Sequence, residues 1–138
     1  MKSNILIVDD EVDTPMLFEQ VFKHEIKNLQ IKLFFVESAE HALEILHENI
    51  IKIHLIIILS DINLSGLSGI FLLKKLKKDY PLIPVCMIAI DGANELQVAH
   101  EYLSVEIINK PINFAKLKDA ISRMLKFNKL RDTGSDND

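Results

Sequence analysis

Short apolar runs alternate with longer amphipathic stretches along the chain, and this alternation restricts the fold more than any other feature of the sequence. Five of the runs have the length and the β-branched character of buried strands. They are Ile5–Val8, Ile31–Val36, His54–Leu59, Pro84–Ile90 and Val105–Ile108. Strands separated by helices in this way predict an α/β fold, a doubly wound parallel sheet in which five strands alternate with five helices.

The stretches between and after these runs carry helix signals, which are capping residues followed by apolar side chains at helical spacing. They run from Thr14 to Ile26, from Ser38 to His47, from Ser68 to Lys78, from about Ala93 to Tyr102, and from Phe114 to Leu125. The length of 138 residues suits one domain with its own core. We expect this domain to cover residues 1–131 and to be followed by a disordered polar tail over residues 132–138.

Composition excludes several classes of protein. The net charge of -4 argues against direct nucleic-acid binding, which usually needs a dominant basic patch. The longest apolar run, Ile50–Leu59, contains a lysine and is shorter than the roughly 18 residues that cross a membrane, so we expect no membrane insertion. One cysteine cannot form an internal disulfide, and the first apolar run is too short for a secretion signal. These features predict a cytoplasmic protein.

Charged side chains follow three of the predicted strands, at the point where each strand ends. Asp9 and Asp10 follow the first strand, Asp61 follows the third and Lys110 follows the fifth. An open doubly wound sheet places its site beyond these carboxyl ends. Clustered carboxylates repel one another unless a cation neutralises them, and Mg²⁺ prefers such hard oxygen ligands. Because aspartate can form an acyl phosphate and lysine can bind a phosphoryl group, the residues predict a Mg²⁺-assisted phosphoryl acceptor centred on Asp61.

From about Asn4 to Phe127, the chain resembles a response-regulator receiver domain of two-component signalling. Four motifs in the family's order carry the resemblance. They are Ile5-Leu-Ile-Val-Asp-Asp-Glu11, Leu59-Ser-Asp-Ile-Asn63 with Gly69, Pro84-Val85 and Lys110-Pro111. The resemblance implies a flavodoxin-like sheet with strand order 2-1-3-4-5.

The resemblance also implies roles for single residues. Asp61 would accept the phosphoryl group from a histidine kinase or a phosphotransfer protein. Lys110 would contact that group through its side-chain ammonium, and the peptide bond from Lys110 to Pro111 would be cis. Asp10 would bind Mg²⁺ (or Mn²⁺) directly, Asp9 largely through water, Asp61 through its carboxylate and Asn63 through its backbone carbonyl. The domain would not be an enzyme in the usual sense, although it would assist its own phosphorylation and dephosphorylation.

Two positions depart from the family pattern. The family places a threonine or serine at the end of the fourth strand, where this chain has Ala89, and an aromatic switch residue in the fifth strand, where it has Ile107. We therefore expect phosphorylation to shift the conformation weakly or by another route. The family tunes dephosphorylation at two further positions, occupied here by Asn63 and Asp91.

Two functions stay open at this point. The first is a chemotaxis-type, stand-alone receiver that signals through a downstream protein target. The sequence is equally compatible with a receiver excised from a longer protein. The second is a phosphorylation-independent interaction module of the same fold, which Ala89 and Ile107 favour. A dimer through the face of the fourth helix, fifth strand and fifth helix is compatible with both. Haloacid-dehalogenase and flavodoxin functions fit poorly, because Asn63 replaces the second aspartate of the former and the acidic loop after the first strand would repel the flavin phosphate.

Overall fold

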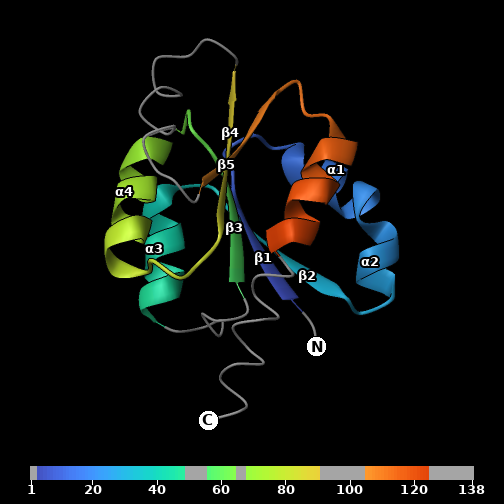
Figure 1. Cartoon of the computed structure of the whole chain (residues 1–138), viewed down its shortest axis with the longest axis horizontal. Helices are drawn as coiled ribbons and strands as arrows, with labels where there is room; N and C mark the ends of the chain where they lie inside the picture. The colour runs from blue at the N-terminus through green and yellow to red at the C-terminus, as the bar shows by residue number, and fades with distance from the viewer. Residues whose placement is uncertain (1–2, 49–55, 65–67, 91–104, 125–138) are drawn as a thin grey trace.

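The computed structural model describes residues 3–48, 56–64, 68–90 and 105–124 (Figure 1). Within these ranges, five parallel strands form one sheet in the order β2-β1-β3-β4-β5. The strands are β1 (Ser3–Val8), β2 (Ile31–Val36), β3 (Ile56–Asp61), β4 (Val85–Ile90) and β5 (Val105–Lys110). The predicted α/β class and strand order are confirmed, and β3 lies at the centre as its apolar sequence indicates.

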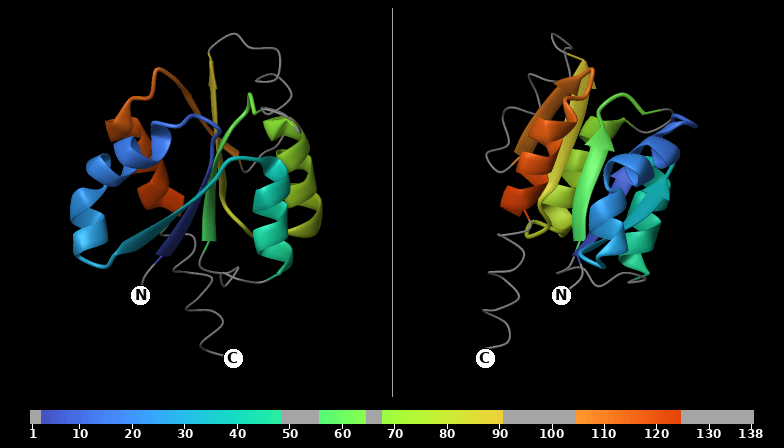
Figure 2. Two further views of the ribbon diagram at one scale, coloured as in Figure 1. Left: turned by 180° about the vertical axis from the view of Figure 1, so that it is seen from behind. Right: turned by 90° about the vertical axis from the view of Figure 1, so that its right-hand side faces the viewer.

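Helices cover both faces of the sheet (Figures 1 and 2). One layer contains α1 (Thr14–Val21), α2 (Lys23–Lys27) and a helix over residues 114–124, and the other contains α3 (Ala39–His47) and α4 (Gly69–Asp79). Each face has its own buried apolar cluster, one including Leu6, Ile58 and Leu72 and the other including Ile7, Leu59 and Leu117. Alternate residues of one strand thus contribute to opposite clusters, as expected for a sheet buried on both faces.

The serine caps predicted for two helices are present. The Ser38 hydroxyl accepts a hydrogen bond from the His41 amide at the start of α3, and the Ser68 hydroxyl accepts one from the Phe71 amide at the start of α4. Each bond is 3.1 Å long and satisfies an amide that has no partner within its helix. These caps fix where each helix begins relative to the strand before it.

The first predicted helix differs from the structure, because it is divided into α1 and α2 at Phe22 (φ -100°, ψ 21°). The Phe22 ring stays buried and stacks on Phe18 at a centroid distance of 6.0 Å. The apolar stripe therefore continues through the break, and its periodicity alone could not reveal the interruption.

Several predictions fall on residues that the structure does not describe. The helix expected over about residues 93–102, the tail at 132–138 and Asp91 lie outside the described ranges. Within those ranges, no helix is long and apolar enough to cross a membrane.

Candidate functional site

Asp61 is the last residue of β3 and lies at the centre of the sheet's carboxyl edge. Its side chain is 3% exposed, yet both carboxylate oxygens are satisfied. Oδ1 accepts a hydrogen bond from the Asn63 amide (2.9 Å), and Oδ2 accepts one from the Lys110 ammonium (2.5 Å). Burying a carboxylate is costly unless it is paired and hydrogen-bonded, and here both conditions are met.

Lys110 ends β5 and reaches Asp61 across the end of β4. Its Nζ also lies 3.6 Å from Glu11 Oε1. Burial lowers the pKa of this ammonium, but the hydrogen bond and charge of Asp61, with the charges of Glu11 and Asp9, outweigh burial and raise the pKa overall. The lysine is thus held protonated beside the carboxylates. The peptide bond from Lys110 to Pro111 is cis, as the resemblance implies.

Asp9 follows β1 and is partly buried beside Asp61. Its Oδ1 accepts a hydrogen bond from the Glu11 amide at 2.8 Å, which fixes the turn between β1 and α1. Burial raises the pKa of Asp9, and the negative charges of Asp61 and Glu11 act in the same direction. Hydrogen bonds from the Glu11 amide and the Thr14 side chain oppose this shift. In the absence of a cation, this carboxylate is therefore in an unfavourable environment for its charge.

Asp9, Glu11 and Asp61 together form an acidic trio. One carboxylate oxygen from each can lie within 4.8 Å of the others. A trio of hard oxygen donors beside an ammonium fits a divalent cation that keeps some water and takes a phosphate oxygen as a further ligand. Among the described residues, the chemistry of the donor set therefore suits Mg²⁺ or Mn²⁺.

Glu11 was not singled out as a ligand from the sequence, although it is the third acid of the run that begins at Asp9. The structure instead places Asp10 in a neighbouring hollow that Val36, Ser38 and His41 also line. The Asn63 side chain is exposed at the edge of the site. Direct metal binding by Asp10 and by the Asn63 carbonyl remains a prediction.

Gly69 brings the start of α4 against the segment that follows Asp61. Its amide donates a hydrogen bond of 2.9 Å to the Ile62 carbonyl. A Cβ atom at this position would lie 2.3 Å from the Asp61 carbonyl oxygen and 2.6 Å from Ile62 Cα. Only glycine permits this approach without a backbone shift, so Gly69 helps to hold Asp61 in place.

Of the two atypical positions, Ala89 lies on the strand beside Asp61, whereas Ile107 lies one strand further away. Asp61 pairs in register with Ile88, and Ala89 is the next residue of β4. Ala89 is fully buried in the apolar cluster on the α3 and α4 face, and the half-buried Ile107 packs against the same cluster. The methyl group of Ala89 cannot hydrogen-bond a phosphoryl group, and an isoleucine cannot act as an aromatic switch.

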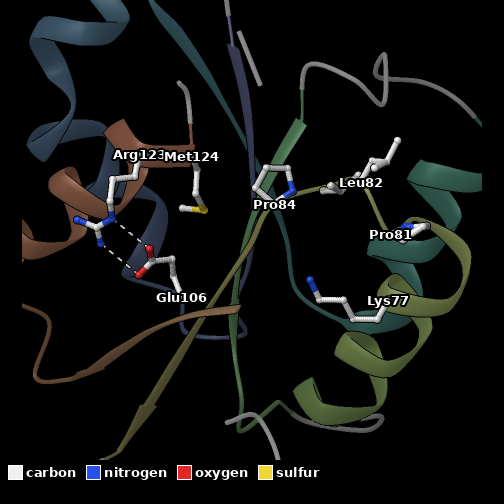
Figure 3. Close-up of a pocket in the computed structure, with 8 residues that line it drawn as sticks. Lys77, Pro81, Leu82, Pro84, Glu106, Arg123 and Met124 are labelled. Atoms are coloured by element: carbon white, nitrogen blue, oxygen red, sulfur yellow. Dashed lines mark hydrogen bonds and ion pairs between the residues drawn. The ribbon is translucent and has the colours of Figure 1, made fainter. Parts of the chain in front are cut away.

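A separate hollow of about 200 Å³ lies at the other end of the sheet, near the start of β4 (Figure 3). Lys77 and Pro84 line one part of it, and Met124 lines another. Arg123 donates two hydrogen bonds of 3.1 Å to the Glu106 carboxylate and so ties the last described helix to β5. Because Pro84 precedes the first residue of β4 while Ala89 lies near its end, this hollow is remote from Asp61 and does not belong to the candidate site.

The family model for the response regulator receiver domain matches residues 5–122. The chain belongs to this family. The receiver is 32% identical over 131 residues to an NtrX-like response regulator of Rickettsia bellii, a match that covers 93% of the chain and 26% of the relative. It therefore spans about a quarter of the length of that curated relative.

Solved structures agree with this assignment. NtrX from Brucella abortus is 30% identical, with a TM-score of 0.76 over 100% of the receiver and 30% of that chain. A response regulator receiver domain from Clostridium thermocellum has a TM-score of 0.77 at 22% identity, with 93% of the receiver and 98% of that chain covered. The second likeness concerns the fold alone. Receiver domains as a family are parts of two-component systems and are not enzymes in the usual sense.

Proposed function

We propose that this receiver accepts a phosphoryl group on Asp61 from a histidine kinase or a phosphotransfer protein, with Mg²⁺ or Mn²⁺ as the cofactor. One observation carries the proposal. Asp61 is a buried carboxylate at the end of the central strand, with the Lys110 ammonium 2.5 Å away and two further carboxylates close by. A merely structural ion pair would not need the additional acids, whose repulsion is unfavourable without a cation.

The chemistry is a simple displacement. An oxygen of the Asp61 carboxylate attacks the phosphorus of a phosphohistidine, the bond between phosphorus and nitrogen breaks, and its electron pair remains on the departing imidazole. The Asn63 amide keeps the carboxylate oriented, and Lys110 donates to a phosphoryl oxygen as negative charge gathers there. When bound, the divalent cation supplies charge neutralisation. Asp61, Asp9, Asp10 and the Asn63 carbonyl would hold it, and Glu11 is a further candidate ligand.

Hydrolysis of the phosphoryl group on Asp61 by a water molecule would limit the lifetime of the phosphorylated state. Asn63 is exposed beside Asp61, and its amide group has the polarity needed to orient an attacking water molecule. By family analogy, Asp91 is the second residue that tunes this step. The receiver would then assist its own dephosphorylation without acting on any other substrate.

The output would pass through protein partners. The receiver spans only part of its relatives, so the activity of the longer proteins is a separate matter. The expected surface for a downstream target or for a second copy comprises the predicted helix over about residues 93–102, β5 and helix 114–124, and its first part lies outside the described residues. We place the protein in the cytoplasm, where its buried free thiol at Cys86 would stay reduced.

The direct test is labelling with a small phosphodonor and Mg²⁺. Wild type should acquire one acid-labile phosphoryl group, and Asp61→Asn should acquire none while keeping its circular dichroism spectrum. Asp79→Asn is the matched control, because Asp79 is an exposed aspartate of α4 that pairs with Lys75. Equal labelling of wild type and Asp61→Asn would contradict the proposal.

A second candidate is an interaction module that works without phosphorylation. The full burial of Ala89 among apolar side chains favours it, because the usual phosphoryl contact from β4 is lacking. Absence of any label on folded wild type, under conditions that label another receiver, would support this candidate in place of the first.

A further inference from the structure

A groove of about 580 Å³ runs between the α1 and α2 side of the molecule and the first half of β2. Ile26, Leu29, Ile31 and Leu33 provide its apolar lining, and Lys23 and Lys27 provide basic groups beside them. We call it the β2 groove. Asp61 ends β3, whereas this groove adjoins the start of β2, so its residues are distinct from those of the acceptor site.

Leu29 has an unusual conformation at this groove. Its φ of 60° is the only positive value among the described non-glycine residues, and the residue is 67% exposed. Its amide donates to the Ile26 carbonyl (3.1 Å), and the next amide, of Gln30, donates to the Glu25 carbonyl (2.9 Å). These two bonds form a Schellman motif that ends α2, and the motif accounts for the left-handed backbone, which glycine would adopt more readily than leucine. The motif leaves a large apolar side chain exposed beside the groove, where a partner can contact it.

The charge around the groove is locally opposite to that of the whole chain. Lys23 and Lys27 are exposed, four residues apart on α2, and therefore on one face of the helix. Glu19 is the one acid among the groove-lining residues, and the Lys32 ammonium lies instead 5.0 Å above the Phe34 ring. On a chain of net charge -4, this small basic area favours an acidic partner.

The strand beside the groove, β2, also has one side that can pair with an added segment. β2 is an edge strand that pairs with β1 on one side, and in the described part of the chain no strand pairs with its other side. Edge strands accept an added extended segment through main-chain hydrogen bonds, with alternate side chains entering pockets.

We propose that the β2 groove docks an extended acidic segment of a partner protein, with an apolar side chain of that segment packed on Leu29 and Ile26. A protein segment fits better than an anionic membrane, because the site is hollowed and the molecule as a whole is negatively charged. The inference does not depend on phosphorylation of Asp61.

The test uses a dye-labelled peptide of alternating glutamate and leucine residues, with its lysine-and-leucine counterpart as the charge control, in fluorescence anisotropy titrations. The glutamate peptide should bind wild type, and Lys23→Glu/Lys27→Glu should weaken it at least about tenfold, since two attractive charges become repulsive. Lys74→Glu/Lys78→Glu on α4 carries the same charge change away from the groove and should leave the affinity within about twofold.

Leu29→Gly separates binding from folding. It removes the exposed side chain and suits the left-handed backbone, so stability in urea should be unchanged or higher while affinity falls about fivefold. The proposal would be overturned if Lys74→Glu/Lys78→Glu lost as much affinity for the glutamate peptide as Lys23→Glu/Lys27→Glu. It would also be overturned if wild type bound the lysine peptide as tightly as the glutamate peptide. Binding to vesicles of phosphatidylcholine and phosphatidylglycerol that is lost in the groove variants would assign the surface to membranes instead. A dimer of wild type that the same variants dissociate would assign it to self-association.

Discussion

The proposed acceptor region and the proposed switch region belong to the same sheet, yet their side chains differ in kind. The acceptor region, which comprises Asp9, Glu11, Asp61 and Lys110, is charged and tightly paired. The switch region, which comprises Ala89 and Ile107, is apolar and packed into a core cluster. Under the proposed function, the capacity to take a phosphoryl group and the capacity to respond to it would therefore rest on different residues.

The energy of a single hydrogen bond is comparable with the coupling energy of a conformational switch. A hydrogen bond to a charged group contributes about 1.5–3 kcal/mol, and the coupling energy of an allosteric switch is typically about 1–3 kcal/mol. Loss of the single hydroxyl contact at Ala89 can therefore remove most of a normal switch. It leaves untouched the groups that surround Asp61.

The largest effect should come from removal of the lysine of the acceptor region. Lys110→Ala should slow phosphorylation of Asp61 by about 100-fold or more, because a preorganised charge on the phosphoryl oxygens is lost. Lys116→Ala, an exposed lysine on the last described helix, is the matched control and should label at the wild-type rate. The rate of acid-labile phosphate formation is measured for both variants. A wild-type rate in Lys110→Ala would contradict the role of Lys110 in the acceptor region.

Next in size should be the effect of filling the space at Gly69. Gly69→Ala should destabilise the fold by about 3 kcal/mol, because the new Cβ would meet backbone atoms of Asp61 and Ile62 that cannot rotate away. Urea unfolding measures the change, and labelling should fall as Asp61 is displaced. Ser68→Ala loses only the helix cap, should cost about 1 kcal/mol and should still label. Equal stability of Gly69→Ala and wild type would refute the close packing behind the acceptor.

A smaller effect concerns the charge of Asp9. Because the folded-state pKa lies above the ordinary value of 3.8, folding is disfavoured as the pH rises through that pKa, and the penalty is absent below about 3.8. In chelator at pH 7, Asp9→Asn should therefore be more stable than wild type, and the two should converge in acid. Added Mg²⁺ should raise the melting temperature of wild type more than that of the variant. A less stable Asp9→Asn in chelator at pH 7 would contradict the charge repulsion in the acceptor region.

The smallest effect tests the switch region. Ala89→Thr should increase the conformational response to phosphorylation, and Ala89→Val should not, since valine has the same shape without the hydroxyl. Both variants share a packing cost of about 1–3 kcal/mol in the buried cluster, so their difference isolates the hydroxyl. Hydrogen exchange at residues 85–90 and 105–110, with and without phosphodonor, measures the response. Equal responses from the threonine and valine variants would show that the missing hydroxyl does not limit switching.

Much of this arrangement follows from the sequence. Apolar run lengths predicted the five strands, and the rule that sites lie at the carboxyl ends of parallel strands brought Asp9, Asp61 and Lys110 together. The position of Glu11 near Asp61 could not be predicted, because it depends on loop geometry, and the role of Asp10 stays a prediction. The Glu11 amide binds Asp9 and turns the chain, so that the Glu11 carboxylate comes near Asp61 while Asp10 lines another hollow. The break at Phe22 also escaped prediction, since the apolar stripe continues through it.

The central claim is that Asp61 takes a phosphoryl group while the switch region responds weakly, and amide NMR with beryllofluoride tests both halves at once. With Mg²⁺ present, we expect saturable shifts at residues 9–11, 61–63 and 110, and much smaller shifts over residues 85–89 and 105–108. Ala89→Thr should enlarge the second set. Absence of shifts around Asp61, or wild-type shifts over residues 85–89 as large as those of Ala89→Thr, would contradict this account.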